Sequence, residues 1–151
     1  FKLILLGRKN QVFFNKLNKI ILNSELKEKV EYIHHQPNAI EYIYAADVLL
    51  QPSRSEALPR TILEAMALHT PIIASDVDGI PELVEDGMSA ILFSLSNLDK
   101  MIKGAQKIYS DNKYRQKLTE NASQRYWKYF SREHHIQKYA NFLKQIQISN
   151  A

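Results

Sequence analysis

Residues 47–67 read DVLLQPSRSEALPRTILEAMA, and this stretch does most to determine the fold of the chain. Its first four residues contain the short apolar run Val48-Leu49-Leu50, which ends before Pro52, as a buried strand does when it leaves a sheet. Apolar residues recur at helical spacing after Pro59, and proline suits the first position of a helix because it has no N–H group to leave unpaired. The stretch therefore predicts a strand, a turn and a helix that begins near Pro59.

The start of that helix is a predicted anion site. The amides of Arg60 and Thr61 would lack partners inside the helix, and the positive end of the helix dipole lies behind them. Glu56 precedes the helix, and Glu64 lies inside it. A carboxylate beside a phosphate site needs another task, such as accepting hydrogen bonds from sugar hydroxyls. Two such carboxylates suggest a ligand with hydroxyls on both sides of its phosphates, and a nucleotide sugar is such a ligand.

Strand and helix patterns alternate along the whole chain. We expect strands at 3–6, 30–33, 47–50, 71–74 and 90–93. We expect helices at 12–22, at 38–44, from 59, at 81–84, 98–109, 114–129 and 132–146. Because the strands are nearly continuous apolar runs, they predict an α/β fold with a Rossmann-like parallel sheet covered by helices on both faces. The 151 residues suit a single domain, 1–151, and no repeat or linker divides them.

Composition narrows the function classes. No apolar run approaches the ~18 residues that a membrane span needs, and the chain does not open with a secretory leader. The absence of cysteine excludes disulfides and thiolate metal sites. The net charge is +4, and basic residues gather toward the C-terminus, which allows an anionic partner such as the inner membrane surface. These residues are Lys103, Lys107, Lys113, Arg115, Lys117, Arg125, Lys128, Arg132, Lys138 and Lys144.

The opening stretch resembles the donor-binding signature of the family 4 retaining glycosyltransferases, in which two glutamates with seven residues between them follow a Pro-Ser pair. The resemblance extends to residues 45–48 (AADV) upstream and 70–87 (TPIIASDVDGIPELVEDG) downstream. Gly7 and the pair Phe130-Ser131 also match, so the matches span nearly the whole chain in the family's order. The resemblance implies one half of a GT-B fold, in which two Rossmann-like domains face each other across a cleft.

The resemblance also implies a role for each matched residue. Glu64 would accept hydrogen bonds from the two ribose hydroxyls, and Glu56 would contact the donor sugar near the reacting centre. The amides of Arg60 and Thr61 would hold the diphosphate. Neither a metal nor another cofactor is implied. Three further residues complete the implied donor-binding set: Leu58, Gly7 and His34, the last of which would lie beside the nucleobase.

Several turns depart from the family's pattern. Residues 57–59 (ALP) stand where many members have Gly-Phe-Gly, so Pro59 donates no N–H group, and we expect the guanidinium of Arg60 to compensate. His69 and Asp78 replace glycines, and residues 89–90 (SA) replace Thr-Gly, so backbone freedom is lost at each turn. We expect Asp78 to shield the N-terminus of the helix at 81–84.

Two parts implied by the resemblance are not in the chain. A first strand that carries an arginine and a lysine, and a whole acceptor-binding domain, would precede Phe1. The chain is therefore expected to be an excised C-terminal piece that is inactive alone. The expected enzyme moves a glycosyl group from a UDP- or GDP-linked sugar to an acceptor hydroxyl with retention of configuration. We expect it to act in cell-surface polysaccharide or glycolipid synthesis, in the cytoplasm and peripherally at the inner membrane face.

Other interpretations of single features stay open. Without a ligand, Glu64 would pair with Arg60 on an exposed helix face, for at most ~0.5 kcal/mol. Asp76 and Asp78 spell the D-x-D pattern by which other glycosyltransferases hold a divalent metal, although coincidence explains it better. Residues 126–130 (YWKYF) would pack on a partner domain, face a membrane interface or stack on bases.

Two alternatives concern the whole chain. The first is a non-catalytic α/β module that senses a nucleotide or phosphate, but such a module would not need paired glutamates. The second is a basic nucleic-acid-binding domain. It is disfavoured because Lys and Arg are scattered among Asp and Glu and form no single stripe.

Overall fold

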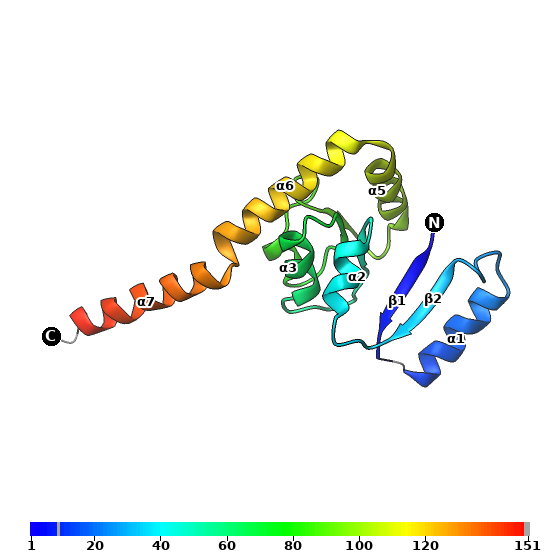
Figure 1. Cartoon of the computed structure of the whole chain (residues 1–151), viewed down its shortest axis with the longest axis horizontal. Coiled ribbons are helices and arrows are strands. Elements are labelled where there is room, and N and C mark those ends of the chain that lie inside the picture. Colours follow the sequence, from blue (N-terminus) through cyan, green and yellow to red (C-terminus); the bar gives the residue numbers. More distant parts are fainter. Residues whose placement is uncertain (9, 150–151) are drawn as a thin grey trace. The chain divides into compact units, whose positions relative to one another are not determined.

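The computed structural model describes residues 1–8 and 10–149, and its elements follow the predicted alternation of strands and helices (Figure 1). Its contacts divide the chain into two compact units, Phe1–Tyr42 and the part from Ile43 onward. Every expected element is present, and most bounds differ from the expected ones by one or two residues.

The first unit is a parallel βαβ arrangement. β1 (Leu3–Gly7) and β2 (Val30–His34) pair in parallel along their full lengths. α1 (Gln11–Leu22) connects them, and Asn10 caps it by accepting a 3.1 Å hydrogen bond from the amide of Phe13. α2 (Ala39–Ala45) follows β2 and leads into the second unit.

The second unit is built on a three-stranded parallel sheet of order β3-β4-β5. Its strands are β3 (Leu49–Gln51), β4 (Ile72–Ser75) and β5 (Ile91–Phe93). Its helices are α3 (Arg60–Ala67), α4 (Ile80–Leu83), α5 (Leu98–Ser110), α6 (Asn112–Tyr129) and α7 (Arg132–Ser149).

Each face of this second sheet carries its own apolar core. Alternate residues of a strand point to opposite faces, so Ile72 of β4 packs in the core that contains α3, and Ile73 packs in the core that contains α5. α6 contributes to both cores, with Ala122 in the first and Leu118 in the second. Helices therefore cover both faces, as the sequence predicted.

α3 begins one residue after the expected first position. Pro59 has an extended backbone (φ −70°, ψ 117°) and is the N-cap, so the first helical residue is Arg60. The carbonyl oxygen of Pro59 accepts a 3.2 Å hydrogen bond from the amide of Ile62. Proline suits the cap as well as the first turn, because its fixed φ is compatible with both and neither position needs its N–H group.

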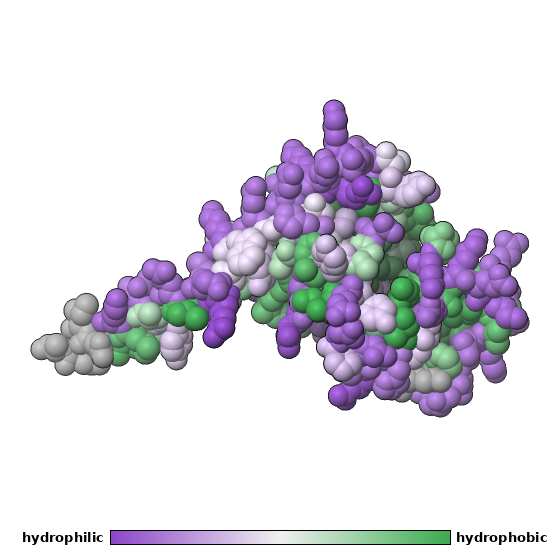
Figure 2. Space-filling view, viewed as in Figure 1, coloured by the Kyte–Doolittle hydropathy of each residue, from purple (hydrophilic) through white to green (hydrophobic). Residues whose placement is uncertain are grey.

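α7 lies outside both cores, and all its side chains from 132 to 146 except His134 are exposed. Apolar side chains gather along one side of this helix (Figure 2): Ile136, Tyr139, Phe142, Leu143 and Ile146. None of the helices in the described part of the chain has the length and apolar character that crossing a bilayer requires.

Candidate functional site

The loop at 52–59 joins the C-terminal end of β3 to the N-terminus of α3, a position at which open parallel sheets bind ligands. Ser75, at the end of β4, donates its hydroxyl to the carbonyl oxygen of Ser53 at 2.6 Å and to that of Gln51 at 3.3 Å. These bonds hold the start of the loop against the neighbouring strand.

Glu56 is fixed by side chains that come from the end of β3. Its Oε1 accepts hydrogen bonds from Ser53 Oγ at 2.9 Å and from Gln51 Nε2 at 3.1 Å. Gln51 Oε1 in turn accepts a 3.1 Å bond from Thr61 Oγ1 in the first turn of α3. Among the described hydrogen bonds, none uses Oε2 of Glu56, so this oxygen is available to accept a bond from a ligand hydroxyl.

Asp78 and Gly79 hold the same loop from the segment that follows β4. Oδ2 of Asp78 accepts hydrogen bonds from Ser55 Oγ at 2.7 Å and from the amide of Glu56 at 3.1 Å. The amide of Gly79 donates to the carbonyl oxygen of Glu56 at 3.0 Å. The bonds from Ser55 and Glu56 lower the pKa of Asp78, so its carboxylate is ionised at neutral pH.

This geometry corrects the expectation that Asp78 shields the N-terminus of the following helix. The N-cap of α4 is Gly79, and no side chain makes a capping bond there. The carboxylate of Asp78 instead binds the loop that carries Glu56, because the turn after β4 brings it beside Ser55 and Glu56.

Backbone conformation explains why this turn is sensitive to residue type. His69 and Asp78 have φ values of 56° and 44°, in the left-handed region that favours glycine, so both replacements do lose backbone freedom as predicted. Gly79 is needed for a different reason. A Cβ at this position would lie 1.6 Å from the carbonyl oxygen of Ala57, so only glycine lets the loop approach this closely.

The N-terminus of α3 has the features of an anion site. Among the described hydrogen bonds, none uses the amides of Arg60 and Thr61, as is usual in the first turn of a helix. The helix dipole adds partial positive charge at this end. The first turn of α3 thus offers two donors beside the fixed carboxylate of Glu56.

Glu64 lies one turn further along α3. Its side chain is 27% exposed, and its carboxylate lies 3.6 Å from the guanidinium of Arg60, whose side chain is 88% exposed. This is the pair that the alternative interpretation of Glu64 expects. A pair with so exposed a cation contributes little to stability, so it does not prevent either side chain from meeting a ligand. Thr61, three positions before Glu64, shares this side of the helix.

The remaining predicted donor residues are found at two places. Leu58 lies in the same loop, where 52% of it is exposed beside the buried Pro59. Gly7 and His34 belong to the first unit, where they are opposite each other at the C-terminal ends of β1 and β2. The hydroxyl of Tyr32 donates a 2.9 Å hydrogen bond to the carbonyl oxygen of Gly7.

The sequence prediction missed the side chains that hold the loop in place. Ser53 and Glu56 form a Ser-x-x-Glu pattern, which predicts a capping box at a helix start, but here the two side chains bond each other in a loop before α3. Ser75 and Asp78 gave no local signal, since their partners lie more than 20 positions away in the sequence.

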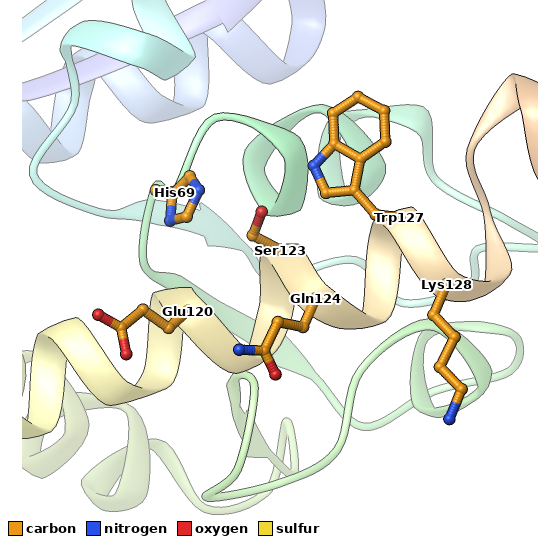
Figure 3. A pocket seen from close by; sticks show the side chains of 6 residues that line it. All are labelled: His69, Glu120, Ser123, Gln124, Trp127 and Lys128. Atoms are coloured by element: carbon orange, nitrogen blue, oxygen red, sulfur yellow. The ribbon is translucent and has the colours of Figure 1, made fainter.

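A separate hollow of about 500 Å³ lies elsewhere on the second unit (Figure 3). Most of its lining side chains follow one another along α6, and His69 comes from the connection between α3 and β4. Its lining residues are His69, Glu120, Ser123, Gln124, Trp127 and Lys128. None of them belongs to the candidate site in the loop at 52–59.

The parallel sheets place the protein in the class of α/β proteins, and its strand-to-helix loop has the features of an anion site: a fixed carboxylate precedes a helix whose first two amides take part in no described hydrogen bond. Comparison with known families identifies it further. The family described as "Glycosyl transferases group 1" matches residues 1–125, and the chain belongs to this family.

Two curated relatives and one solved structure show the range of similar proteins. The N-acetyl-alpha-D-glucosaminyl L-malate synthase of Bacillus anthracis is 25% identical over 138 residues, which cover 91% of this chain and 36% of the relative. A lipopolysaccharide core biosynthesis glycosyltransferase of Rhizobium meliloti is 24% identical over 119 residues, with 79% and 35% covered. The crystal structure of Anabaena HepE in complex with UDP-glucose has a TM-score of 0.86 at 22% identity, with 95% and 41% covered.

The similarity covers only part of each of these proteins. The chain spans about two fifths or less of the length of the proteins just named. The structural likeness supports the fold, that of the Rossmann-like domain of GT-B glycosyltransferases.

Proposed function

We propose that the chain is the donor-binding domain of a retaining glycosyltransferase and binds a nucleoside diphosphate sugar at the loop 52–59 and the N-terminus of α3. The observation that carries this proposal is the fixed carboxylate of Glu56 in the loop that leads into α3: no described hydrogen bond uses its Oε2 or the amides of Arg60 and Thr61. Such a site can accept bonds from a sugar and donate bonds to its diphosphate. Membership of the glycosyl transferases group 1 supports sugar transfer as the reaction.

The proposed roles follow the order of groups in the donor. Glu64 accepts hydrogen bonds from the ribose, the amides of Arg60 and Thr61 bind the diphosphate, and Glu56 contacts the sugar. The guanidinium of Arg60, which is exposed in the first turn of α3, would also serve the diphosphate. Leu58 belongs to the same loop, and Gly7 and His34 of the first unit complete the proposed donor-binding residues, with His34 as the contact to the nucleobase.

These residues would act mainly by position and charge. Holding the donor in one orientation lowers the entropic part of the barrier, and helix amides that face the diphosphate stabilise the charge that develops as it departs. A metal is not part of the proposal. The carboxylate of Asp78, one of the two residues of the D-x-D pattern, already accepts two hydrogen bonds from the protein.

The cellular setting is also proposed. The proposed donor is UDP- or GDP-linked, and the structure of Anabaena HepE in complex with UDP-glucose supports the UDP-linked form. Transfer would need an acceptor-binding domain in addition to this donor-binding domain. A role in cell-surface polysaccharide or glycolipid synthesis is supported by the relative named for lipopolysaccharide core biosynthesis. The proposed sugar transfer would take place in the cytoplasm, with the enzyme bound peripherally at the inner membrane face.

Titration of the isotope-labelled chain with UDP, GDP and ADP, followed by NMR, tests the proposal. At least one nucleotide should shift the amide signals of Arg60 and Thr61 and bind with a Kd of about mM to high μM, since weak binding is expected from one side of a cleft. Glu120→Gln, which removes an exposed carboxylate on α6, should leave the Kd unchanged. Absence of any shift in the first turn of α3 at mM nucleotide would refute the donor site.

A further inference from the structure

Asp78 combines an unfavourable backbone conformation with an unusual set of bonds. Among the described residues, only His69 and Asp78 are non-glycine residues with positive φ. A side chain persists in this conformation when surrounding contacts compensate for it. The carboxylate of Asp78 accepts two hydrogen bonds from one loop, whereas no described hydrogen bond uses the side chain of His69. The contacts of Asp78 therefore indicate that its carboxylate holds that loop in place.

Asp78 and Gly79 hold the main chain of Glu56 at both of its polar groups. The amide of Glu56 donates to Oδ2 of Asp78 at 3.1 Å, and its carbonyl oxygen accepts from the amide of Gly79 at 3.0 Å. We call this pair of residues, Asp78 and Gly79, the clasp. Ser55 adds a third bond to it at 2.7 Å.

Two sets of hydrogen bonds fix Glu56, one from the clasp and one from Gln51 and Ser53. Gln51 and Ser53 hold the carboxylate, and the clasp holds the main chain of the same residue. A loop without a regular hydrogen-bond ladder has many alternative conformations, and each main-chain bond removes some of them. The position of the Glu56 carboxylate depends on both sets of bonds.

We propose that Asp78 is a positioning residue for the donor sugar: it holds the hydroxyl of Ser55 and the main-chain amide of Glu56 so that the Glu56 carboxylate meets the sugar. This inference rests on the proposed function of the loop as a donor site. Asp78 acts through Glu56 and does not touch the donor. Glycine at position 78 would allow the same turn, but it would leave the loop without the two bonds to Oδ2.

Three substitutions separate the carboxylate from the backbone conformation. Asp78→Gly relieves the left-handed strain and removes both bonds, whereas Asp78→Asn keeps an oxygen that can accept them. His69→Gly is the matched control, because it relieves the same kind of strain at a residue whose side chain does not contact the loop.

Amide hydrogen exchange tests the hydrogen bond between Glu56 and the clasp in the absence of a ligand. The amide of Glu56 should exchange at least ~10-fold faster in Asp78→Gly than in the parent chain, because the amide has lost its hydrogen-bond acceptor and is no longer protected. In Asp78→Asn and His69→Gly the rate should stay within ~3-fold of the parent rate. An unchanged rate in Asp78→Gly would overturn the inference.

Titration with UDP and with UDP-glucose measures how the substitutions affect binding of the sugar part of the donor. The preference for UDP-glucose, expressed as the ratio of the two Kd values, should fall by at least ~3-fold in Asp78→Gly, with the Kd for UDP unchanged. Asp78→Asn should restore the preference. If Asp78→Gly does not fold, Ser55→Ala provides the test, because it removes one of the two bonds and should change both readouts in the same direction.

The outcomes distinguish this inference from the proposed function. The nucleotide and its sugar-linked form are chosen from the titration with UDP, GDP and ADP, and a parent chain that binds none of the three refutes the proposed function and, with it, the role of Asp78 towards the sugar. A parent chain that prefers UDP-glucose, with an Asp78→Gly variant that keeps the full preference, overturns the positioning role alone. A parent chain with equal Kd values for UDP and UDP-glucose also overturns the positioning role and leaves the nucleotide site in place.

Discussion

Glu56 and Glu64 are held in different ways. Glu56 is fixed by Gln51 and Ser53, and no described hydrogen bond uses its Oε2, whereas Glu64 contacts only the exposed guanidinium of Arg60 among the described ion pairs. The two carboxylates are therefore suited to different tasks. A fixed group contributes to a reacting centre by its position, and a group on a helix face contributes binding energy.

Replacement of Glu64 tests its binding role. Glu64→Gln should weaken nucleotide binding by ~1.5–3 kcal/mol, because the ribose hydroxyls lose charge-assisted hydrogen bonds. Calorimetry with UDP on the parent and variant chains measures the difference. A 2′-deoxyribose nucleotide should bind the parent chain more weakly than UDP does but show little further loss with the variant. A Kd within about twofold of the parent value would show that Glu64 serves only the surface pair with Arg60.

Replacement of Glu56 tests its placement at the reacting centre. In a catalytically active form of the enzyme, Glu56→Gln should mainly lower kcat and leave nucleotide affinity nearly unchanged, since misplacement of the sugar is felt in the transition state. The amide oxygen of glutamine can still accept the bonds from Gln51 and Ser53, so the loop should keep its structure. Steady-state kinetics with the donor varied would decide, and an equal kcat would remove Glu56 from the proposed mechanism.

At the scale of elements, the strand–loop–helix from β3 to α3 could be predicted because its signals are local. Apolar residues preceded Pro52, and Pro59 marked the start of α3 to within one residue. The bonds inside the loop could not be predicted in the same way. Ser75 and Asp78 reach the loop only after β4 has paired beside β3, and such long-range polar contacts leave no periodic pattern in a sequence.

The closeness of the loop to the residues after β4 predicts a severe effect at Gly79. Gly79→Ala should lower the free energy of unfolding by about 3–4 kcal/mol, because the added Cβ overlaps the carbonyl oxygen of Ala57 and the backbone has to move. Gly87→Ala is the matched control. Gly87 has φ of 72° and open space around its Cβ position, so its substitution should cost only about 1–2 kcal/mol of backbone strain. Urea denaturation measures both, and equal losses would contradict the close approach.

At the scale of the whole molecule, the family match covers most of the chain, whereas the proteins that the chain resembles are more than twice as long. Nucleotide binding and sugar transfer should therefore separate. The chain alone should bind UDP but release no more glucose from UDP-glucose than a buffer control does, and it should transfer none to added acceptors. Chromatographic analysis of the products tests this, and turnover by the chain alone would contradict it.

Removal of metal ions provides a second test on the whole chain. Nucleotide affinity should be the same with and without excess EDTA, because Asp78 is engaged by Ser55 and Glu56 and the proposed diphosphate site consists of helix amides. Asp78→Asn should likewise keep the parent affinity. A loss of binding in EDTA that Mn²⁺ restores would revive the D-x-D interpretation.

The place of α6 against both sides of the second sheet limits how far this chain can be shortened. Leu118 closes one apolar core and Ala122 closes the other, so a version that stopped after α5 would open both interiors to water at once. A version that kept α6 and stopped before α7 would retain every buried side chain of both cores. The side chains that fill both cores therefore end with α6 and the residue after it, and α7 adds none to either core.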